Sequence, residues 1–315
     1  MSIDPGDMTS DQPSKLGSAY AKLFSASTIS NLGDGIGVIA YPWLASAVTR
    51  DGFLIALVVV VQRLPWLFFS LPAGVITDRS DRRTLMIQAN WARAVLTVGV
   101  AIAVLTQQGS LLSPDEIDAN AAPEENLLIY GVVLLTTLLL GTAEVLYDNA
   151  AQTFMPAVVP AEHLEKANGR LWSAETVANT FLGPPLGAAL LAIAFAVPFF
   201  VDAFSFALSA VLVTLIRPGS MLRSTGPKST AQETTWKEEL KEGFGWLWSH
   251  DLFRPMAVIL GMLNMLGTLA MATFVLYGQE VLGTSPTEFA LLSTGGAVGG
   301  VIGGWSGSKL SLIHI

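Results

Sequence analysis

Long apolar stretches separated by shorter polar ones dominate the chain. Eight of them are long enough to cross a lipid bilayer, which takes about 20 apolar residues. They cover residues 20–47, 53–77, 84–106, 127–150, 170–194, 197–216, 253–278 and 286–310. All should be helices, because a strand edge finds no hydrogen-bond partner in lipid. The pattern therefore predicts an all-α integral membrane protein that crosses the bilayer several times.

The composition agrees with this prediction and narrows the chemistry. Charged residues make up 13% of the chain and the mean hydropathy is +0.53, whereas a soluble domain carries about 25% charged residues. The absence of cysteine excludes disulfides and thiolate metal sites. The three histidines form no metal cluster, and no glycine-rich phosphate loop indicates ATP as the energy source. We expect no metal, no cofactor and, with a net charge of −8, no nucleic-acid partner.

Lysine and arginine predict the orientation. Fourteen of the 17 lie in segments on the same side as the N-terminus, Arg50 alone lies on the other side, and Arg63 and Arg93 lie within spans. Because positive residues concentrate in cytoplasmic loops, we expect a cytoplasmic N-terminus and a multi-pass protein of the cell membrane. Residues 1–18 lack the basic start and apolar core of a signal peptide, which indicates a disordered tail.

The loop between the second and third spans has the densest charge. Residues 74–83 read GVITDRSDRR, and the charged ones are Asp78, Arg79, Asp81, Arg82 and Arg83. Gly74 is expected to let backbones approach closely. The arginines can pair with carboxylates or with anionic lipid headgroups. A positive-inside anchor is the simpler interpretation, but an anchor needs only the arginines.

The pattern Gly-x-x-x-Asp-Arg followed by Asp-Arg-Arg resembles the loop between helices 2 and 3 of the major facilitator superfamily (MFS) of secondary transporters. The usual form there is G-x-x-x-D-R-x-G-R-R. Asp81 stands where that form has glycine, which resembles the branch containing siderophore and macrolide efflux proteins. The resemblance implies that the loop is a cytoplasmic gate and that Asp148, on the fourth span, pairs with Arg82.

Several polar residues fall inside predicted spans. A charged residue there costs about 2.5–3.5 kcal/mol on insertion scales, so each is a functional candidate. Asp34 lies in the middle of the first span, one turn from Asn31. This pair could form a proton or substrate site. Alternatively, Asp34 could pair with Arg63 or Arg93 only to hold helices together.

The fourth span carries Glu144 and Asp148, which share one helix face because they are four residues apart. Glu144 could carry a proton or form an ion pair with Arg93. The span lacks the arginine-containing pattern that many proton antiporters of the superfamily carry, which weighs against proton coupling. Glu175 and Asp202 lie closer to the ends of their spans, so solvated or interfacial positions are expected for both.

The fifth span contains Gly183, Pro184, Pro185 and Gly187. Proline kinks a helix and small residues let a neighbour pack closely, so an ordinary transmembrane kink would explain them. The stretch is also similar to the G-P-x-x-G-G signature of MFS exporters, with Ala188 in place of the last glycine. That resemblance favours efflux over uptake.

A polar connector follows the sixth span, and a capping-box spacing of Thr235 and Glu238 predicts a short amphipathic helix at the inner interface. Members of the superfamily have twelve spans in two halves, so we expect a chain truncated after eight. The expected parts are a tail (1–18), an N-terminal six-helix half (19–216), the connector (217–252), the first two helices of the second half (253–310) and an incomplete or non-native end (311–315).

These patterns predict a secondary active transporter that works by alternating access. The expected activity is proton-coupled efflux of an amphipathic, drug-like or siderophore-like small molecule by a monomer in the bilayer. An MFS uptake transporter or uniporter is the alternative, followed by a non-transporting structural or sensor protein or an inactive fragment. An enzyme is not expected, because no His cluster, Ser-His pair or Asp-Asp pair lies at one depth.

Overall fold

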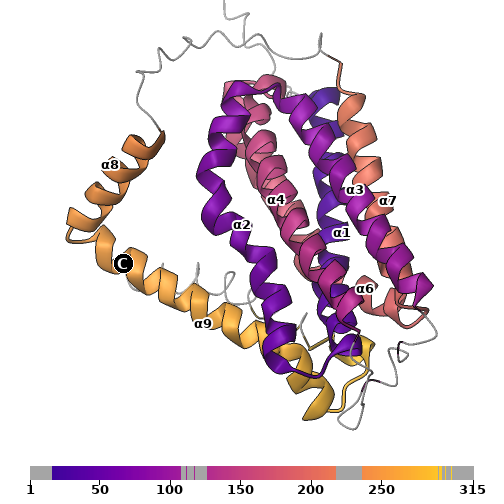
Figure 1. Ribbon diagram of the computed structural model, residues 1–315. Coiled ribbons are helices and arrows are strands. Elements are labelled where there is room, and N and C mark those ends of the chain that lie inside the picture. The colour runs from indigo at the N-terminus through magenta and orange to yellow at the C-terminus, as the bar shows by residue number, and fades with distance from the viewer. Residues whose placement is uncertain are drawn as a thin grey trace, which may run out of the picture.

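The computed structural model describes residues 16–107, 111, 117, 126–217, 236–289, 291, 292, 295 and 299. Within this part of the chain every regular element is a helix, and the first six crossings form one bundle (Figure 1). The prediction of an all-α membrane fold is thus confirmed.

The bundle consists of four long helices, a broken fifth crossing and a sixth crossing. The long helices are α1 (Ser18–Val48), α2 (Gly52–Arg79), α3 (Arg82–Thr106) and α4 (Leu127–Val158). A short turn η2 (Ala161–His163) leads into the fifth crossing, made of α5 (Leu164–Thr176), the π-helical segment η3 (Val177–Leu182) and α6 (Gly183–Leu191). The sixth crossing is α7 (Ala196–Thr214). Helices α8 (Trp236–Ser249) and α9 (Phe253–Glu280) follow.

Five of the described helices, α2, α3, α4, α7 and α9, are long and apolar enough to span a membrane. Helix α1 has the length, at 31 residues, but carries polar residues in its middle. The fifth predicted span is divided among three segments, and most of the eighth lies outside the described residues, as does Thr235 of the predicted capping box.

Helix α1 packs against α7 and the fifth crossing, while α3 lies between α4 and α7. Two apolar clusters fill this bundle, one at each end. One surrounds Trp43 and Phe199, and the other surrounds Leu23, Met86 and Phe154. Neither cluster extends across the middle of α1, α3 and α7. A layer of buried polar side chains lies there, between the two clusters.

The contact between α1 and the fifth crossing is made by backbone atoms. A Cβ added to Gly35 would lie 2.7 Å from the carbonyl oxygen of Asn179, and one added to Gly187 would lie 2.7 Å from that of Ile36. Gly183 lies directly against Gly35. The π-helical segment ends where Pro184 and Pro185 begin, as expected where proline removes backbone donors and disturbs the α-helical ladder. The predicted close packing at this motif is therefore present.

The predicted close approach at Gly74 is wrong. Among the described residues, no atom of another helix lies within 4 Å of the position that a Cβ would take there. The loop has a different organising residue, Asp81, which forms the N-cap of α3 and accepts a hydrogen bond from the Thr84 amide at 2.7 Å. Asp51 caps α2 in the same way. The residue that departs from the usual form of the motif thus starts the next helix.

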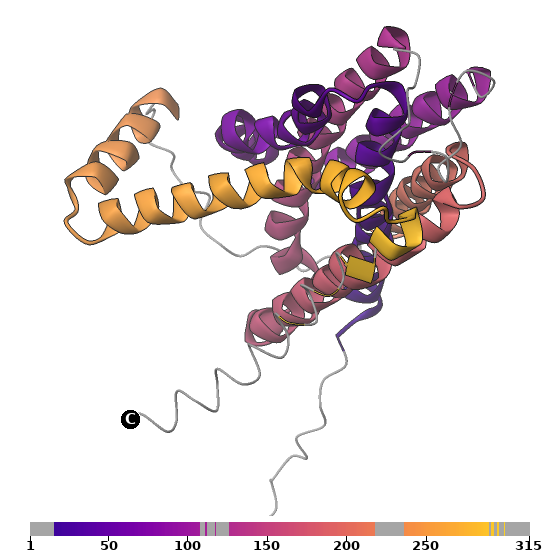
Figure 2. The same cartoon turned by 90° about the horizontal axis from the view of Figure 1, so that it is seen from below.

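Helices α8 and α9 lie outside the bundle, and α8 touches α2. Figure 2 shows α9 extending away from the other helices, with α8 at its far end. The C-terminal part of α9 contacts α2 and α1, with Leu276 against Gly52. Helix α8 lies within the predicted connector, and its side chains Phe244, Trp246 and Trp248 are exposed. Its position at a membrane interface remains a prediction.

Candidate functional site

Arg93 of α3 is the centre of the polar layer. Its side chain is 2% exposed, forms an ion pair with Asp34 of α1 and donates to the hydroxyl of Ser30 at 3.2 Å. The guanidinium also lies over the ring of Phe206 of α7, 3.9 Å from its centroid. Of the two partners considered for Asp34, the structure selects Arg93. Arg93 is buried in the bundle, where a charge without a partner is strongly destabilising, so the Asp34 carboxylate stabilises it there.

Further carboxylates surround the pair. Glu144 lies within electrostatic range of Arg93, Asp34 and Arg63, and the indole of Trp66 is next to it. Asp148, one turn along α4, also lies in the field of Arg93. Among the described residues, neither carboxylate has a cation within ion-pair distance. The direct Glu144–Arg93 ion pair considered from the sequence is therefore not formed in this conformation.

Asn31 connects α1 with the π-helical segment. Its amide donates to the Ser27 carbonyl at 2.9 Å, and its side-chain oxygen accepts from Asn179 at 3.5 Å. Both asparagines are half-buried. Asn31 is thus close to the Asp34–Arg93 pair, as its spacing on the helix implied, and extends the polar layer towards the fifth crossing.

Asp202 of α7 is the residue that the sequence interpretation misplaced. It was expected to be solvated or interfacial, but it is 2% exposed and lies within the field of Asp34 and Arg93. The reason is the close approach of α7 to α1, where the space that a Gly33 side chain would fill holds Asp202 Oδ1 and Ser205 Oγ. Two glycines one turn apart in α1, Gly33 and Gly37, were the only sequence signal for this contact.

Other polar side chains of this layer were also missed. Asn90 donates to Ser209 at 2.8 Å, and Tyr147 shares a hydrogen bond of 3.2 Å with Ser27. All four are buried. Asparagine, serine and tyrosine occur in most membrane helices, so nothing in a single sequence distinguishes those that face the bundle interior.

The charged loop lies at one end of the bundle, with Asp78, Arg79 and Asp81 exposed. Arg82 lies 3.8 Å from Asp78, and it donates to the Thr153 carbonyl of α4 at 3.1 Å rather than to Asp148. The expected Arg82–Asp148 pair is therefore absent from this conformation of the described residues. Arg83 donates to the carbonyls of Val213 and Thr214 in the last turn of α7, where the helix leaves carbonyls without a following turn.

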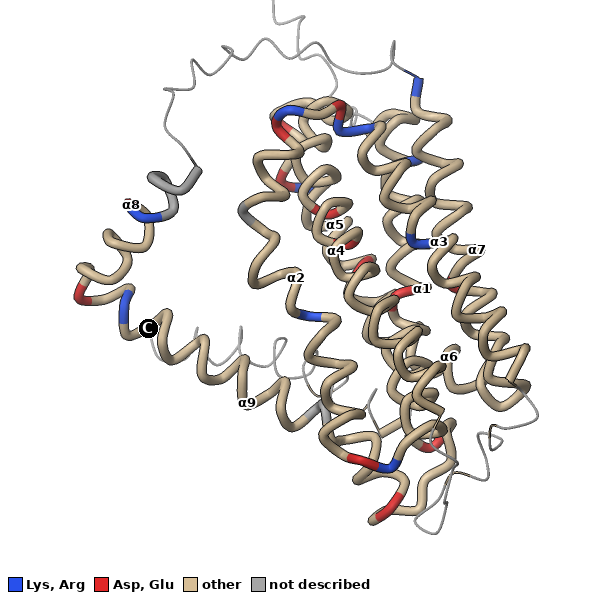
Figure 3. The backbone as a smooth tube through the Cα atoms, viewed as in Figure 1, with Lys and Arg blue, Asp and Glu red and all other residues tan. Residues whose placement is uncertain are grey.

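The opposite end of the bundle holds a second set of contacts. Arg50, between α1 and α2, donates to Gln279 and Glu280 of α9, each at 2.7 Å. Gln279 in turn donates to the Ser46 hydroxyl at 2.9 Å, and both side chains are buried. We call Arg50, Ser46, Gln279 and Glu280 the α1–α9 clasp. Figure 3 shows charged residues at both ends of the bundle and only a few midway along its helices.

A cavity of about 660 Å³ lies between α1, α2, the fifth crossing and α9. Most of its lining is apolar, and the polar exceptions include Gln62, Arg63, Asn179 and Asn264. Pro184 of the kink motif also lines it. The ring of Phe289 lines the cavity and packs against Trp43, 5.5 Å between centroids. An apolar wall with a few polar groups is typical of a small-molecule site.

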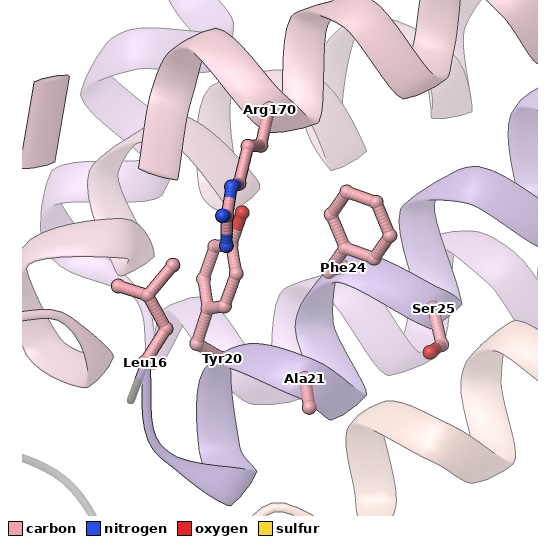
Figure 4. A pocket seen from close by; sticks show the side chains of 6 residues that line it. All are labelled: Leu16, Tyr20, Ala21, Phe24, Ser25 and Arg170. Atoms are coloured by element: carbon pink, nitrogen blue, oxygen red, sulfur yellow. The ribbon is translucent and has the colours of Figure 1, made fainter. Parts of the chain in front are cut away.

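A smaller hollow of about 430 Å³ lies at the N-terminal end of α1. Figure 4 shows Arg170 reaching from α5 towards Tyr20 of α1. The Tyr20 hydroxyl donates to the Ala167 carbonyl at 3.0 Å. These contacts tie α5 to α1 at the end of the bundle that holds the charged loop.

Residues 23–313 match the profile of the Major Facilitator Superfamily. The multidrug efflux pump Tap of Mycobacterium tuberculosis (strain H37Rv) is 23% identical over 252 residues, which are 78% of this chain and 54% of Tap. The MFS-type transporter YfiS of Bacillus subtilis (strain 168) is 26% identical over 225 residues, 70% of this chain and 48% of YfiS. The chain thus spans about half the length of these curated relatives. It belongs to the Major Facilitator Superfamily of multi-pass membrane transporters.

Proposed function

We propose that the protein exports an amphipathic small molecule across the cell membrane and that an inward flow of protons drives the export. The observation that carries this proposal is the excess of carboxylates inside the bundle. Glu144, Asp148 and Asp202 each lie in the fields of Asp34 and Arg93, and Arg63 is the other cation of the described residues that faces this group, next to Glu144. A carboxylate without a cation is costly in an apolar interior unless it binds a proton.

The cavity is the proposed cargo site. It is large enough for a drug-sized molecule, its wall is mainly apolar, and Arg63 brings one charge to it. Arg63 also lies in the field of Glu144, so the cavity and the carboxylate layer are electrostatically connected. Loading a proton and loading cargo can therefore influence each other without direct contact.

Efflux rather than uptake is supported by two observations. One of the relatives is named a multidrug efflux pump. The exporter-like motif, in addition, places Pro184 at the cavity and Gly183 and Gly187 against α1. The motif therefore shapes the wall along which cargo would pass.

The contacts at the two ends support transport by alternating access. With the N-terminus in the cytoplasm, the charged loop is cytoplasmic and the α1–α9 clasp faces outward. The clasp joins α9 to the first helices, whereas α9 diverges from the bundle towards its other end (Figures 1 and 2). The proposed resting state is closed outside, and export requires the clasp to open.

A transport assay tests the proposal. The protein as expressed from its gene is purified, reconstituted in liposomes and given fluorescent amphipathic compounds under an imposed pH gradient. We expect cargo to move against its own gradient while protons move the opposite way, and a protonophore should abolish this movement. Cargo movement that is equal with and without the pH gradient would exclude proton coupling. Movement of cargo and protons in the same direction would indicate uptake.

A further inference from the structure

Asp202 differs from the other buried acid of the α1–α3–α7 contact. Asp34 has Arg93 as its direct partner. Asp202 is buried on α7, and its Oδ1 atom has no hydrogen-bond partner among the described residues. Ser205, one turn away, donates its hydrogen to the Asp202 backbone carbonyl at 2.7 Å. Ser205 has a single hydrogen, for which the Asp202 backbone carbonyl and the nearby Asp202 carboxylate compete, so it is not a dedicated donor to the carboxylate.

Among the described residues, Arg93 is the cation that the elements packed against Asp202 present to it. Helix α1 presents Asp34 and Tyr41 to it, and α3 presents Arg93. Helix α6, which also touches α7, has no titratable residue in its sequence GPPLGAALL. Arg93 already pairs with Asp34 and bonds Ser30. An ionised Asp202 would thus have to share Arg93 with Asp34, with which Arg93 already pairs.

The hydroxyl groups of Tyr41 on α1 and Thr97 on α3 are buried next to each other, and Tyr41 lies in the field of Asp202. Tyr41 and Thr97 are 2% and 0% exposed. The Asp202 carboxyl group therefore has the hydroxyl groups of Tyr41 on α1 and Ser205 on its own helix nearby, and either oxygen can accept the hydrogen of a neutral carboxylic acid. Such a set suits a neutral carboxylic acid, which needs one acceptor for its hydrogen.

We propose that Asp202 carries the proton that is coupled to cargo movement, and that Asp34 serves as the fixed counter-charge of Arg93. This inference rests on the proposed proton-driven export and identifies the residue that performs it. In one access state the carboxylate takes up a proton from water outside the membrane and becomes neutral. In the other state it releases the proton to the cytoplasm and regains its negative charge. This charge attracts Arg93 and weakens the Arg93–Asp34 pair.

The test measures proton and cargo movement in the same liposomes. An enclosed pH-sensitive dye reports protons, and labelled cargo is counted in parallel. We expect Asp202→Asn to reduce the number of protons moved per cargo molecule at least tenfold. Asp202→Glu, which can still titrate, should retain coupled movement with a displaced pH profile. The matched control is Asp251→Asn, which removes an exposed carboxylate between α8 and α9 and should leave the ratio unchanged.

Each outcome decides between hypotheses. Normal proton movement per cargo in Asp202→Asn overturns the assignment, as does a Glu variant whose pH profile matches that of the unaltered protein. Loss of the proton-to-cargo ratio in Asp34→Asn but not in Asp202→Asn transfers the role to Asp34. If the unaltered protein moves cargo without protons, the proposed coupling itself fails. Sodium movement that replaces proton movement also overturns the proton assignment, and a sodium-sensitive dye detects it.

Discussion

The two ends of the bundle use charge in opposite ways. At the loop between α2 and α3, the Asp78–Arg82 pair is 3.8 Å long, joins residues only four apart and is largely exposed. At the other end, Arg50 holds two side chains of α9 that are more than 200 residues away, each at 2.7 Å. At the first end the long-range contacts of Arg82 and Arg83 are made to backbone carbonyls of α4 and α7, whereas at the second end Arg50 contacts side chains of α9. Charge density along a chain therefore does not indicate which kind of partner its charged residues contact.

The largest effect is expected from breaking the α1–α9 clasp. A hydrogen bond to a charged group contributes about 1.5–3 kcal/mol, so Arg50→Ala should favour the open state by roughly tenfold or more. The chain has no cysteine, which allows Asn264→Cys in the cavity wall to be labelled selectively. A membrane-impermeant thiol reagent added from the Arg50 side should react faster in the Arg50→Ala background.

The control for this prediction is Arg254→Ala, which removes an exposed arginine at the start of the same helix. Labelling of Asn264→Cys should not change in that background. Equal rates with and without Arg50 would show that the clasp does not close this end of the cavity.

An intermediate effect is expected at Asp81, the cap of α3. Losing a capping side chain costs about 1 kcal/mol, so Asp81→Ala should lower the thermal stability of the purified protein at neutral pH. Asp81→Asn should not, because asparagine caps equally well. The hydrogen bonds from Thr84 lower the pKa of Asp81.

The lowered pKa gives this prediction a pH dependence of known sign. The stabilisation by the charged cap is complete above the ordinary aspartate pKa of about 3.9 and is lost as the pH falls through the lowered folded-state pKa. The difference between the unaltered protein and Asp81→Ala should therefore shrink in acid, while Asp81→Asn should show no such trend. A pH-independent difference would mean that the cap does not act through its charge.

The smallest effect on stability is expected at Asp78. An exposed ion pair contributes about 0–1 kcal/mol, so Asp78→Asn should leave protein yield and melting temperature nearly unchanged. Transport should nevertheless fall if the loop is a gate whose charges distinguish two access states. The measurement is the initial transport rate per amount of reconstituted protein. An unchanged rate would favour the simpler interpretation of the loop as a positive-inside anchor.

The helices could be predicted because the apolar run that indicates each one lies within its own stretch of sequence. Long apolar runs gave most of their positions, and the Gly183–Gly187 motif correctly predicted a close contact. The pairing of Asp34 with Arg93 was one of two alternatives, since a buried charge requires a partner but the sequence does not say which. These features depend on one helix at a time or on a requirement that any fold must satisfy.

The missed features depend on how far apart two helices lie. Asp202 appeared close to a helix end and is buried because α7 approaches the glycines of α1. Arg82 reaches Thr153 instead of Asp148, a difference of little more than one helical turn that a motif cannot resolve. The resemblance likewise gave no reason to expect Arg50 to contact Gln279, because that contact requires the position of α9.

The backbone contact between Gly35 of α1 and Gly183 of α6 has a mechanical consequence. No side chain separates the backbones of the two helices there. A small displacement of one helix past the other therefore requires no side-chain rotamer to change. Steric repulsion between main-chain atoms, rather than side-chain repacking, would set the limit of such a motion. A methyl group at either position would clash with the backbone of the other helix. The contact would then become more rigid without any change in the charge or polarity of the protein.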